Sequence, residues 1–442
     1  MAQTFFFYDL ETSGLNPRQD RIMQFAGQRT DMNLEPIGEP YNLLVTLNDD
    51  TLPSPDALMV TGITPQKTVE EGYSEAQFAR MLSQEIFTPD TIAVGFNNIR
   101  FDDEFIRHVL WRNFHDPYEW SWKEGRSRWD VLDVARLTRA LRPEGINWPL
   151  DAKGEPSNRL ELITSANGIA HENAHDALAD VTALIAVTKL IKQKQPQLYD
   201  YLLKMRDKKA VQQLVNVDDK KPFVYASGRY DKEFAKTTVA FPLTTSRNSG
   251  VVVYDLRYDP TPFVGLSQEE LAKKIFASWE ERQAEDFVKL PVKELQYNRC
   301  PAVAPLGVLE QGDGWQKISL DLATVQKHQD MLLKYLDFAE KLRGIFENKP
   351  AFKKLPDPEA QLYDGFLNDR DRLRVEAVRN ANERELADFH PEFQDERLAP
   401  LLLHYKARNF PRSLSEDDLA QWEIWRAQHL QAQLPQFMAS LQ

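Results

Sequence analysis

The sequence contains one cysteine, Cys300, and no apolar run long enough to cross a membrane. A single cysteine excludes an intramolecular disulfide framework and fits a reducing compartment. We also expect no signal peptide, because a strand-like apolar run begins within the first few residues. These absences predict a cytoplasmic protein without a membrane segment.

The chain also lacks internal repeats and low-complexity segments, so it is expected to fold into ordinary compact domains. Apolar residues make up 42% of the sequence, which is enough to build cores. At 442 residues, the chain is too long for one ordinary core. Its length therefore predicts two or three domains.

Two acidic residues follow a short aromatic run near the N-terminus. The run, residues 5–8, is typical of a buried strand. Asp9 and Glu11 come at its end, before the turn-forming residues 12–14. Residues i and i+2 of a strand share a face, so both carboxylates can address one site. Taken alone, alternating acids at a strand end are equally typical of a solvated edge.

A third acidic position follows a second strand-like segment, residues 91–96. Asp102 and Asp103 come after a polar turn, and the apolar pattern of residues 105–110 then predicts a helix. The alternative role for either aspartate is to cap the N-terminus of that helix. Asp103 fits the capping role.

The last candidates lie in residues 173–180. An amphipathic pattern predicts a helix over residues 177–192. His175 would lie at the start of this helix, and Asp180 one turn inside it. Each residue alone would be an ordinary surface side chain.

Taken together, these residues resemble the active-site pattern of the DEDDh exonuclease superfamily. The five matching positions are Asp9, Glu11, Asp102, His175 and Asp180. Further stretches narrow the resemblance to the bacterial exonuclease I family, from about Thr4 to about Trp425. These stretches are residues 97–104, 142–149, 173–177 and 405–411.

The resemblance implies an α/β, ribonuclease H-like exonuclease domain over residues 1–193. An SH3-like α+β domain would follow over residues 197–349, and an α-helical C-terminal domain over residues 350–442. The local patterns agree, with short strands expected near residues 223–225, 238–241 and 250–254. Helices are expected over residues 198–214, 267–282 and 320–347, the second opened by a Ser267–Glu270 capping box.

The acidic residues predict a metal site. Oxygen ligands without a cysteine or histidine cluster suit Mg²⁺ or Mn²⁺ and disfavour zinc. Two such ions about 4 Å apart can stabilise the attacking and leaving oxygens of a phosphodiester. We expect Asp9 to bridge two Mg²⁺ ions, with Mn²⁺ able to substitute. Glu11, Asp102 and Asp180 would complete the ligand shells, and His175 would orient and deprotonate the attacking water.

The family resemblance implies a 3′→5′ exodeoxyribonuclease that degrades single-stranded DNA processively to 5′-mononucleotides, in DNA repair or recombination. We expect a monomer. One alternative is a 3′→5′ exoribonuclease, because the five residues do not read the 2′-hydroxyl. The two additional domains argue against it, since such RNA enzymes are commonly compact. A second alternative is a non-catalytic single-strand-binding adaptor. Such an adaptor would be expected to have lost some of the acidic residues of the pattern, and here all of them are present.

Aromatic and basic residues are interleaved between Trp111 and Trp129, and we interpret this stretch as a candidate groove wall, because single-strand binders stack bases on rings and track phosphates with cations. About half of these rings are expected to be core. The cations of the stretch are Arg112, Lys123, Arg126 and Arg128. By resemblance, the DNA contacts are Glu11, Arg107, Tyr118, Trp122, Arg136 and Arg159, with Lys293 and Asn298 in the SH3-like domain.

The net charge of −13 does not match the basic profile of most nucleic-acid binders. Phosphate contacts depend on local rather than total charge, however. We therefore expect the acidity to discourage indiscriminate duplex binding and to favour a strand held in a lined groove. This hypothesis predicts a steep salt dependence of single-strand binding.

The resemblance also implies a protein partner. Members of the family dock the acidic C-terminal tail of the bacterial single-stranded-DNA-binding protein. Arg142, Tyr201 and Lys221 match the positions of the basic pocket. The alternative is that these residues are ordinary surface side chains.

Overall fold

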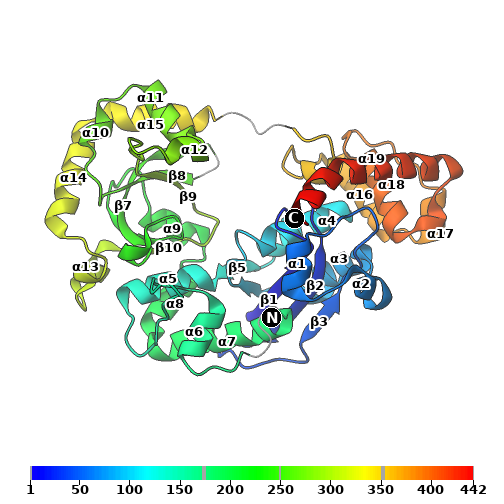
Figure 1. Ribbon diagram of the computed structural model, residues 1–442, viewed down its shortest axis with the longest axis horizontal. Coiled ribbons are helices and arrows are strands. Elements are labelled where there is room, and N and C mark those ends of the chain that lie inside the picture. The colour runs from blue at the N-terminus through cyan, green and yellow to red at the C-terminus, as the bar shows by residue number, and fades with distance from the viewer. Residues whose placement is uncertain (1, 172–175, 248–249, 350–353, 442) are drawn as a thin grey trace. The chain divides into compact units, whose positions relative to one another are not determined.

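The computed structural model describes residues 2–171, 176–247, 250–349 and 354–441 (Figure 1). The chain forms two compact units. Unit 1 comprises residues 1–129, 170–186 and 353–442, and unit 2 comprises residues 130–169 and 187–352. His175 lies outside the described residues.

Unit 1 is built on a five-stranded sheet of order β3-β2-β1-β4-β5. Its strands are β1 (Thr4–Thr12), β2 (Ile22–Thr30), β3 (Tyr41–Leu44), β4 (Thr91–Gly95) and β5 (Ser127–Asp130). The aromatic run of β1 is fully buried, which explains why this strand occupies the centre of the sheet. β2 pairs with β1 in the antiparallel direction, and β4 pairs with it in the parallel direction.

Helices surround this sheet and continue into the C-terminal segment. They are α1 (Pro55–Thr61), α2 (Pro65–Glu71), α3 (Glu75–Met81), the π-helix η1 (Leu82–Ile86), α4 (Asp102–Arg112), η2 (Glu119–Ser121), η5 (Pro358–Gln361), α16 (Asp369–Asn380), α17 (Glu383–Ala387), α18 (Leu398–Asn409), η6 (Pro411–Ser413) and α19 (Glu416–Ser440). Trp111 and Phe114 share one buried apolar cluster with Val378, Leu401 and Tyr405. The C-terminal helices therefore pack directly on the end of α4.

Unit 2 contains a second five-stranded sheet, of order β10-β6-β7-β8-β9. Its strands are β6 (Phe223–Ala226), β7 (Thr237–Ser246), β8 (Gly250–Asp255), β9 (Val292–Gln296) and β10 (Ala302–Pro305), all paired in the antiparallel direction. The three strands expected after residue 223 are confirmed as β6, β7 and β8.

The remaining helices accompany this second sheet. They are α5 (Val131–Leu141), α6 (Leu160–Ala166), α8 (Pro196–Lys204), α9 (Lys208–Leu214), η3 (Lys232–Phe234), α10 (Thr261–Val264), α11 (Gln268–Phe276), α12 (Trp279–Arg282), η4 (Leu306–Glu310), α13 (Gly314–Lys317), α14 (Leu322–Lys334) and α15 (Leu336–Glu347). Helix α7 (Ala177–Lys194) begins in unit 1 and ends in unit 2. In the described parts of the chain, every helix is too short or too polar to span a bilayer.

Three helices expected to be continuous are interrupted. The 198–214 segment divides into α8 and α9, because the Asp207 side chain accepts hydrogen bonds from the backbone N–H groups that start α9. The predicted capping box of Ser267 and Glu270 is confirmed at α11. A second capping box at Ser278 then starts α12. The 320–347 segment divides at Tyr335 into α14 and α15.

Candidate active site

Three carboxylates converge beside the central strand of unit 1. Asp9 and Glu11 lie two residues apart on β1 and are both partly buried. Asp180 lies in the first turn of α7. Each residue offers one ligand oxygen, and these atoms all lie within 4.8 Å of one another. These three side chains supply hard oxygen donors, the ligand type that Mg²⁺ and Mn²⁺ prefer.

The electrostatics place Asp102 in the same group. Burial raises the pKa of Asp9 well above its usual range, and the carboxylates of Asp102, Asp180 and Glu11 raise it further. Burial also raises the pKa of Glu11 to about 8, with Asp180, Asp102 and Asp176 as additional causes. Divalent cations bound between these carboxylates would offset their mutual repulsion and allow all of them to be ionised.

Asp102 and Asp103 have different roles although they are adjacent. Asp102 is the first residue of α4 and is 5% exposed. The predicted capping role of Asp103 is wrong, because the N-cap residue is Phe101, which makes no side-chain capping bond. The buried Asp103 carboxylate instead pairs with Arg128 and accepts a hydrogen bond from the Tyr8 hydroxyl. It therefore anchors α4 next to Asp9 on β1.

The start of α7 is held by β2. Asp176 Oδ1 accepts a hydrogen bond from Ala179 N at 3.1 Å and so caps the helix. Gln24, which lies opposite Glu11 in the strand register, donates from Nε2 to Asp176 Oδ2 at 3.4 Å. β2 thus connects the strand that carries Glu11 with the helix that carries Asp180.

His171 was not predicted as a site residue from the sequence. Its Nε2 lies 2.6 Å from Asp180 Oδ1, and its side chain is 5% exposed. A neighbour that holds a metal-ligating carboxylate fixes the direction of its oxygen atoms. The available signal was a second histidine in the same stretch as His175.

The aromatic stretch between Trp111 and Trp129 is mostly core. Its buried rings are Trp111, Phe114, Trp120 and Trp129, four of the six, which is more than the half expected. Tyr118 is partly buried, and Trp122 is 64% exposed. Trp122 is therefore the exposed ring of this stretch, whereas the Tyr118 ring already contacts the rings of Tyr363 and Phe366.

Two of the cations in this stretch were wrongly assigned to a groove wall. Arg112 is buried and pairs with Glu75 at 2.7 Å, and Arg128 is buried beside Asp103. A buried guanidinium requires such a partner, so neither side chain faces phosphate. Lys123 pairs with Glu119, and Arg126 donates to a backbone carbonyl.

The expected strand contacts are divided between the two units. In unit 1, the Arg107 guanidinium lies 5.6 Å from the centre of the Tyr118 ring and pairs with Glu104. In unit 2, Lys293 Nζ lies 4.3 Å from the ring centre of Tyr225. The other unit 2 candidates are Arg136, which pairs with Asp133, Arg159, whose side chain is 67% exposed, and Asn298, which is exposed.

The three residues expected in a partner pocket all belong to unit 2. Arg142 Nη2 donates to Val308 O at 3.3 Å and to Gln311 Oε1 at 3.4 Å. Tyr201 is partly buried against the core of the second sheet, and Lys221 is exposed.

Comparison with protein families gives three matches along the chain. The family model described as "Exonuclease" matches residues 6–188. The "Exonuclease I SH3-like domain" matches residues 206–348, and the "Exonuclease I C-terminal domain" matches residues 356–442. One curated relative is exodeoxyribonuclease I of Haemophilus influenzae, which is 40% identical over 99% of this chain and 93% of its own length.

Solved structures of exonuclease I are also similar. The Escherichia coli enzyme in complex with a dA16 oligonucleotide has a TM-score of 0.95 and 39% identity, covering 99% of this chain and 93% of that chain. A zinc-bound complex of the E. coli enzyme with single-stranded DNA has a TM-score of 0.94 and 38% identity, with the same coverage. A structure of SSB/exonuclease I with the inhibitor CFAM has a TM-score of 0.90 and 38% identity, again with the same coverage.

Proposed function

The chain belongs to the exonuclease I family, and from this premise we propose that it is a 3′→5′ exodeoxyribonuclease that degrades single-stranded DNA to 5′-mononucleotides. The observation that carries the proposal is the convergence of Asp9, Glu11 and Asp180 on one site. The similar enzyme bound to an oligonucleotide supports single-stranded DNA as the substrate. We further propose a monomer that acts processively in DNA repair or recombination.

We propose that the carboxylates hold two Mg²⁺ ions, for which Mn²⁺ can substitute. When bound, these ions supply positive charge at the attacking and leaving oxygens of the phosphodiester. Asp9 is assigned to contact both ions, while Glu11, Asp102 and Asp180 would complete the ligand set. His175 is assigned to orient the attacking water and accept its proton. The all-oxygen donor set favours Mg²⁺ over zinc.

We propose three domains along the chain, covering residues 1–193, 197–349 and 350–442. The three family matches support this division. Unit 1 of the structure contains most of the first domain together with the third.

Digestion of matched DNA and RNA strands tests the function. Labelled single strands of both kinds are incubated with Mg²⁺ and, in parallel, with a chelator. We expect stepwise shortening of DNA from its 3′ end with Mg²⁺, no shortening with chelator, and intact RNA. Equal degradation of RNA would favour the exoribonuclease alternative. DNA binding without degradation would favour the adaptor.

Trp122 is the best candidate for a base-stacking residue, since its ring is 64% exposed. Stacking of a base on an aromatic ring contributes about 1–3 kcal/mol, so Trp122→Ala should weaken single-strand binding by roughly 5- to 150-fold. Fluorescence anisotropy with labelled oligonucleotides in Ca²⁺ measures this change. The matched control is Trp279→Ala, which removes a tryptophan that is 73% exposed on α12. Equal effects of the two variants would remove the special role of Trp122.

We propose that the acidic C-terminal tail of the single-stranded-DNA-binding protein docks at Arg142, Tyr201 and Lys221. The similar SSB/exonuclease I structure supports this partner. Truncating a group that makes charge-assisted hydrogen bonds costs about 1.5–3 kcal/mol, so Arg142→Ala should weaken tail-peptide binding at least about tenfold. Anisotropy with a labelled tail peptide measures the affinity. Absence of binding to the unaltered protein, or binding unaffected by the substitution, contradicts the proposal.

A further inference from the structure

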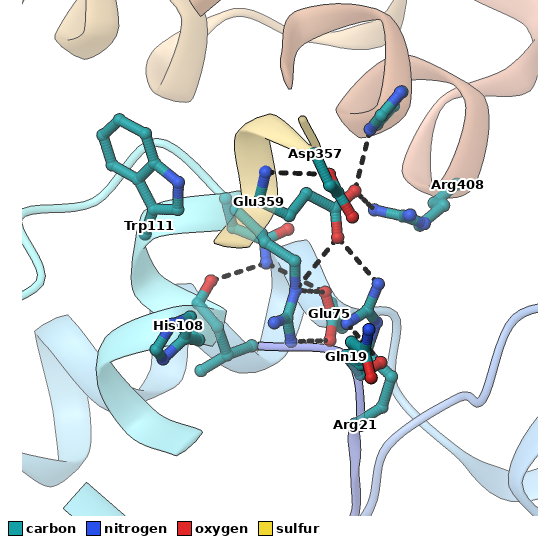
Figure 2. Close-up of polar contacts among 12 residues, drawn as sticks. Gln19, Arg21, Glu75, His108, Trp111, Asp357, Glu359 and Arg408 are labelled. Carbon is teal, nitrogen blue, oxygen red and sulfur yellow. Dashed lines mark hydrogen bonds and ion pairs between the residues drawn. The ribbon is translucent and has the colours of Figure 1, made fainter. Parts of the chain in front are cut away.

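A buried charge cluster outside the acidic site connects the C-terminal domain with the exonuclease domain (Figure 2). At its centre is Glu359 on η5, whose side chain is fully buried. Its Oε2 lies 2.7 Å from Arg21 Nη2, and its Oε1 lies 2.6 Å from Arg408 Nη1. Burial opposes ionisation of Glu359, but Arg408 and Arg21 outweigh it and hold its pKa well below the usual range. Glu359 is therefore an ionised anchor between two parts of the chain.

The cluster is balanced in charge. Arg112 Nε lies 3.9 Å from Glu359 and is also bound by Glu75. Arg408 is bound by Asp50 at 2.7 Å. Three arginines thus face three carboxylates, and all of these side chains are almost completely buried. Removing one partner from such a set leaves an uncompensated buried charge, which is strongly unfavourable.

A metal site is not the explanation of this cluster. Asp357, Glu359 and His404 offer ligand atoms within 4.8 Å of one another. Both oxygens of Glu359 are already bonded to guanidinium groups, however, and His404 Nδ1 donates to Oε1 at 2.8 Å. A divalent cation placed there would be repelled by Arg21 and Arg408 at short range. The cluster serves to join chain segments.

The joined segment lies directly beside the metal-binding strand. Arg21 precedes the first residue of β2, and Ser13 comes two residues after Glu11. Ser13 N donates to Arg21 O at 2.8 Å, and Arg21 N donates to Ser13 Oγ at 2.9 Å. The segment that follows Glu11 is therefore hydrogen-bonded to Arg21, and the Arg21 guanidinium in turn pairs with Glu359.

The strand that starts after Arg21 supports both ligand-bearing elements. β2 pairs with β1 along its length, with Gln24 opposite Glu11. Gln24 also bonds Asp176 and the backbone N–H of Ala177 at the start of α7. A shift at the beginning of β2 would therefore move Glu11 and Asp180 relative to each other.

We propose that Glu359 is a positioning residue for the metal centre, which anchors Arg21 and thereby makes metal affinity depend on the docked C-terminal domain. This inference rests on the proposed function, because it takes Asp9, Glu11 and Asp180 as the metal ligands. It gives the C-terminal domain a role in the chemistry in addition to any contact with DNA.

Mn²⁺ binding by the full-length protein tests the inference without DNA or turnover. Free Mn²⁺ is measured by electron paramagnetic resonance during titration of the unaltered protein and of Glu359→Gln. We expect the substitution to weaken Mn²⁺ binding roughly tenfold, the lower end of the effect of supporting residues around a metal.

The matched control is Asp371→Asn. Asp371 is also fully buried, but its carboxylate accepts hydrogen bonds from the backbone N–H groups of Gln394 and Asp395 within the C-terminal domain. This variant should lower the melting temperature and leave the Mn²⁺ isotherm unchanged. Equal weakening of Mn²⁺ binding by the control and by Glu359→Gln would overturn the positioning role, since general destabilisation would then explain both.

Glu359→Asp provides a second test if Glu359→Gln does not fold. It keeps the charge but shortens the side chain. We therefore expect a Mn²⁺ affinity that is lower than that of the unaltered protein, but by less than tenfold. An unchanged isotherm in a folded Glu359 variant overturns the inference. If Asp9→Asn left the Mn²⁺ isotherm unchanged, the assignment of Asp9 as a metal ligand would be contradicted, and with it the proposed function rather than the positioning role alone.

Discussion

Asp9→Asn should lower turnover of single-stranded DNA by at least about 10³-fold, because metal-based charge stabilisation contributes several kcal/mol and each 1.36 kcal/mol is a factor of ten. Asparagine keeps the size of the side chain but removes the negative charge. Asp9 lies on the central strand, and its ligand oxygen is close to those of Glu11 and Asp180. The measurement is the rate of nucleotide release at saturating DNA over a range of Mn²⁺ concentrations.

Although it lowers turnover, the same substitution should stabilise the metal-free protein. Burial and neighbouring carboxylates raise the pKa values of Asp9 and Glu11, that of Glu11 to about 8. A carboxyl whose pKa is raised on folding costs stability when it ionises, and this cost grows as the pH rises from its unfolded value to its folded value. Asp9→Asn should therefore raise the melting temperature in chelator at pH 8, and the difference should shrink towards pH 4.

With added Mn²⁺, the unaltered protein should have a higher melting temperature than Asp9→Asn. Binding to the native state stabilises the unaltered protein by mass action, whereas the variant should gain much less. The matched control is Asp176→Asn, since asparagine can still cap α7, and we expect this variant to retain most Mn²⁺ binding. A melting temperature of Asp9→Asn below that of the unaltered protein in chelator at pH 8 would contradict the repulsion argument.

The carboxylate positions on β1 and α7 were predictable because they follow from local geometry. A period of two places Asp9 and Glu11 on one face of a strand, and a helical pattern places Asp180 one turn after the helix begins. Each periodicity depends only on residues that are close together in the sequence. The family resemblance then indicated which distant segments had to meet.

The distinction between Asp102 and Asp103 was not predictable from local pattern. It depends on Tyr8, which is 95 residues away from Asp103, and on Arg128, which is 25 residues away. The misplacement of Arg112 and Arg128 on a groove wall has the same cause, since their partners are set by tertiary packing. The pairing of Arg21 with Glu359 joins positions 338 residues apart. Sequence pattern carries no information on such a pair.

Two of the three helix interruptions, those at Asp207 and Ser278, occur at residues that cap the next helix. Ser278 is followed three residues later by Glu281, the same capping-box pattern that predicted α11 at Ser267 and Glu270. A helix boundary inside an amphipathic run therefore depends on recognising the capping residue itself.

His175→Ala should lower turnover by roughly 10²- to 10⁴-fold, the usual contribution of a general base, and should leave Mn²⁺ and DNA binding nearly unchanged. Turnover is measured at saturating Mn²⁺, and the Mn²⁺ and DNA affinities of the same variant are measured by separate titrations.

The control for His175→Ala is His171→Ala, which removes the hydrogen bond to Asp180 Oδ1. A residue that orients a metal ligand should raise the Mn²⁺ concentration needed for half-maximal rate, and high Mn²⁺ should restore most of the activity. A general base cannot be replaced by more metal, so His175→Ala should remain slow at every Mn²⁺ concentration. Recovery of His175→Ala by Mn²⁺, or normal turnover without it, would assign this histidine to support of the metal site rather than to proton transfer.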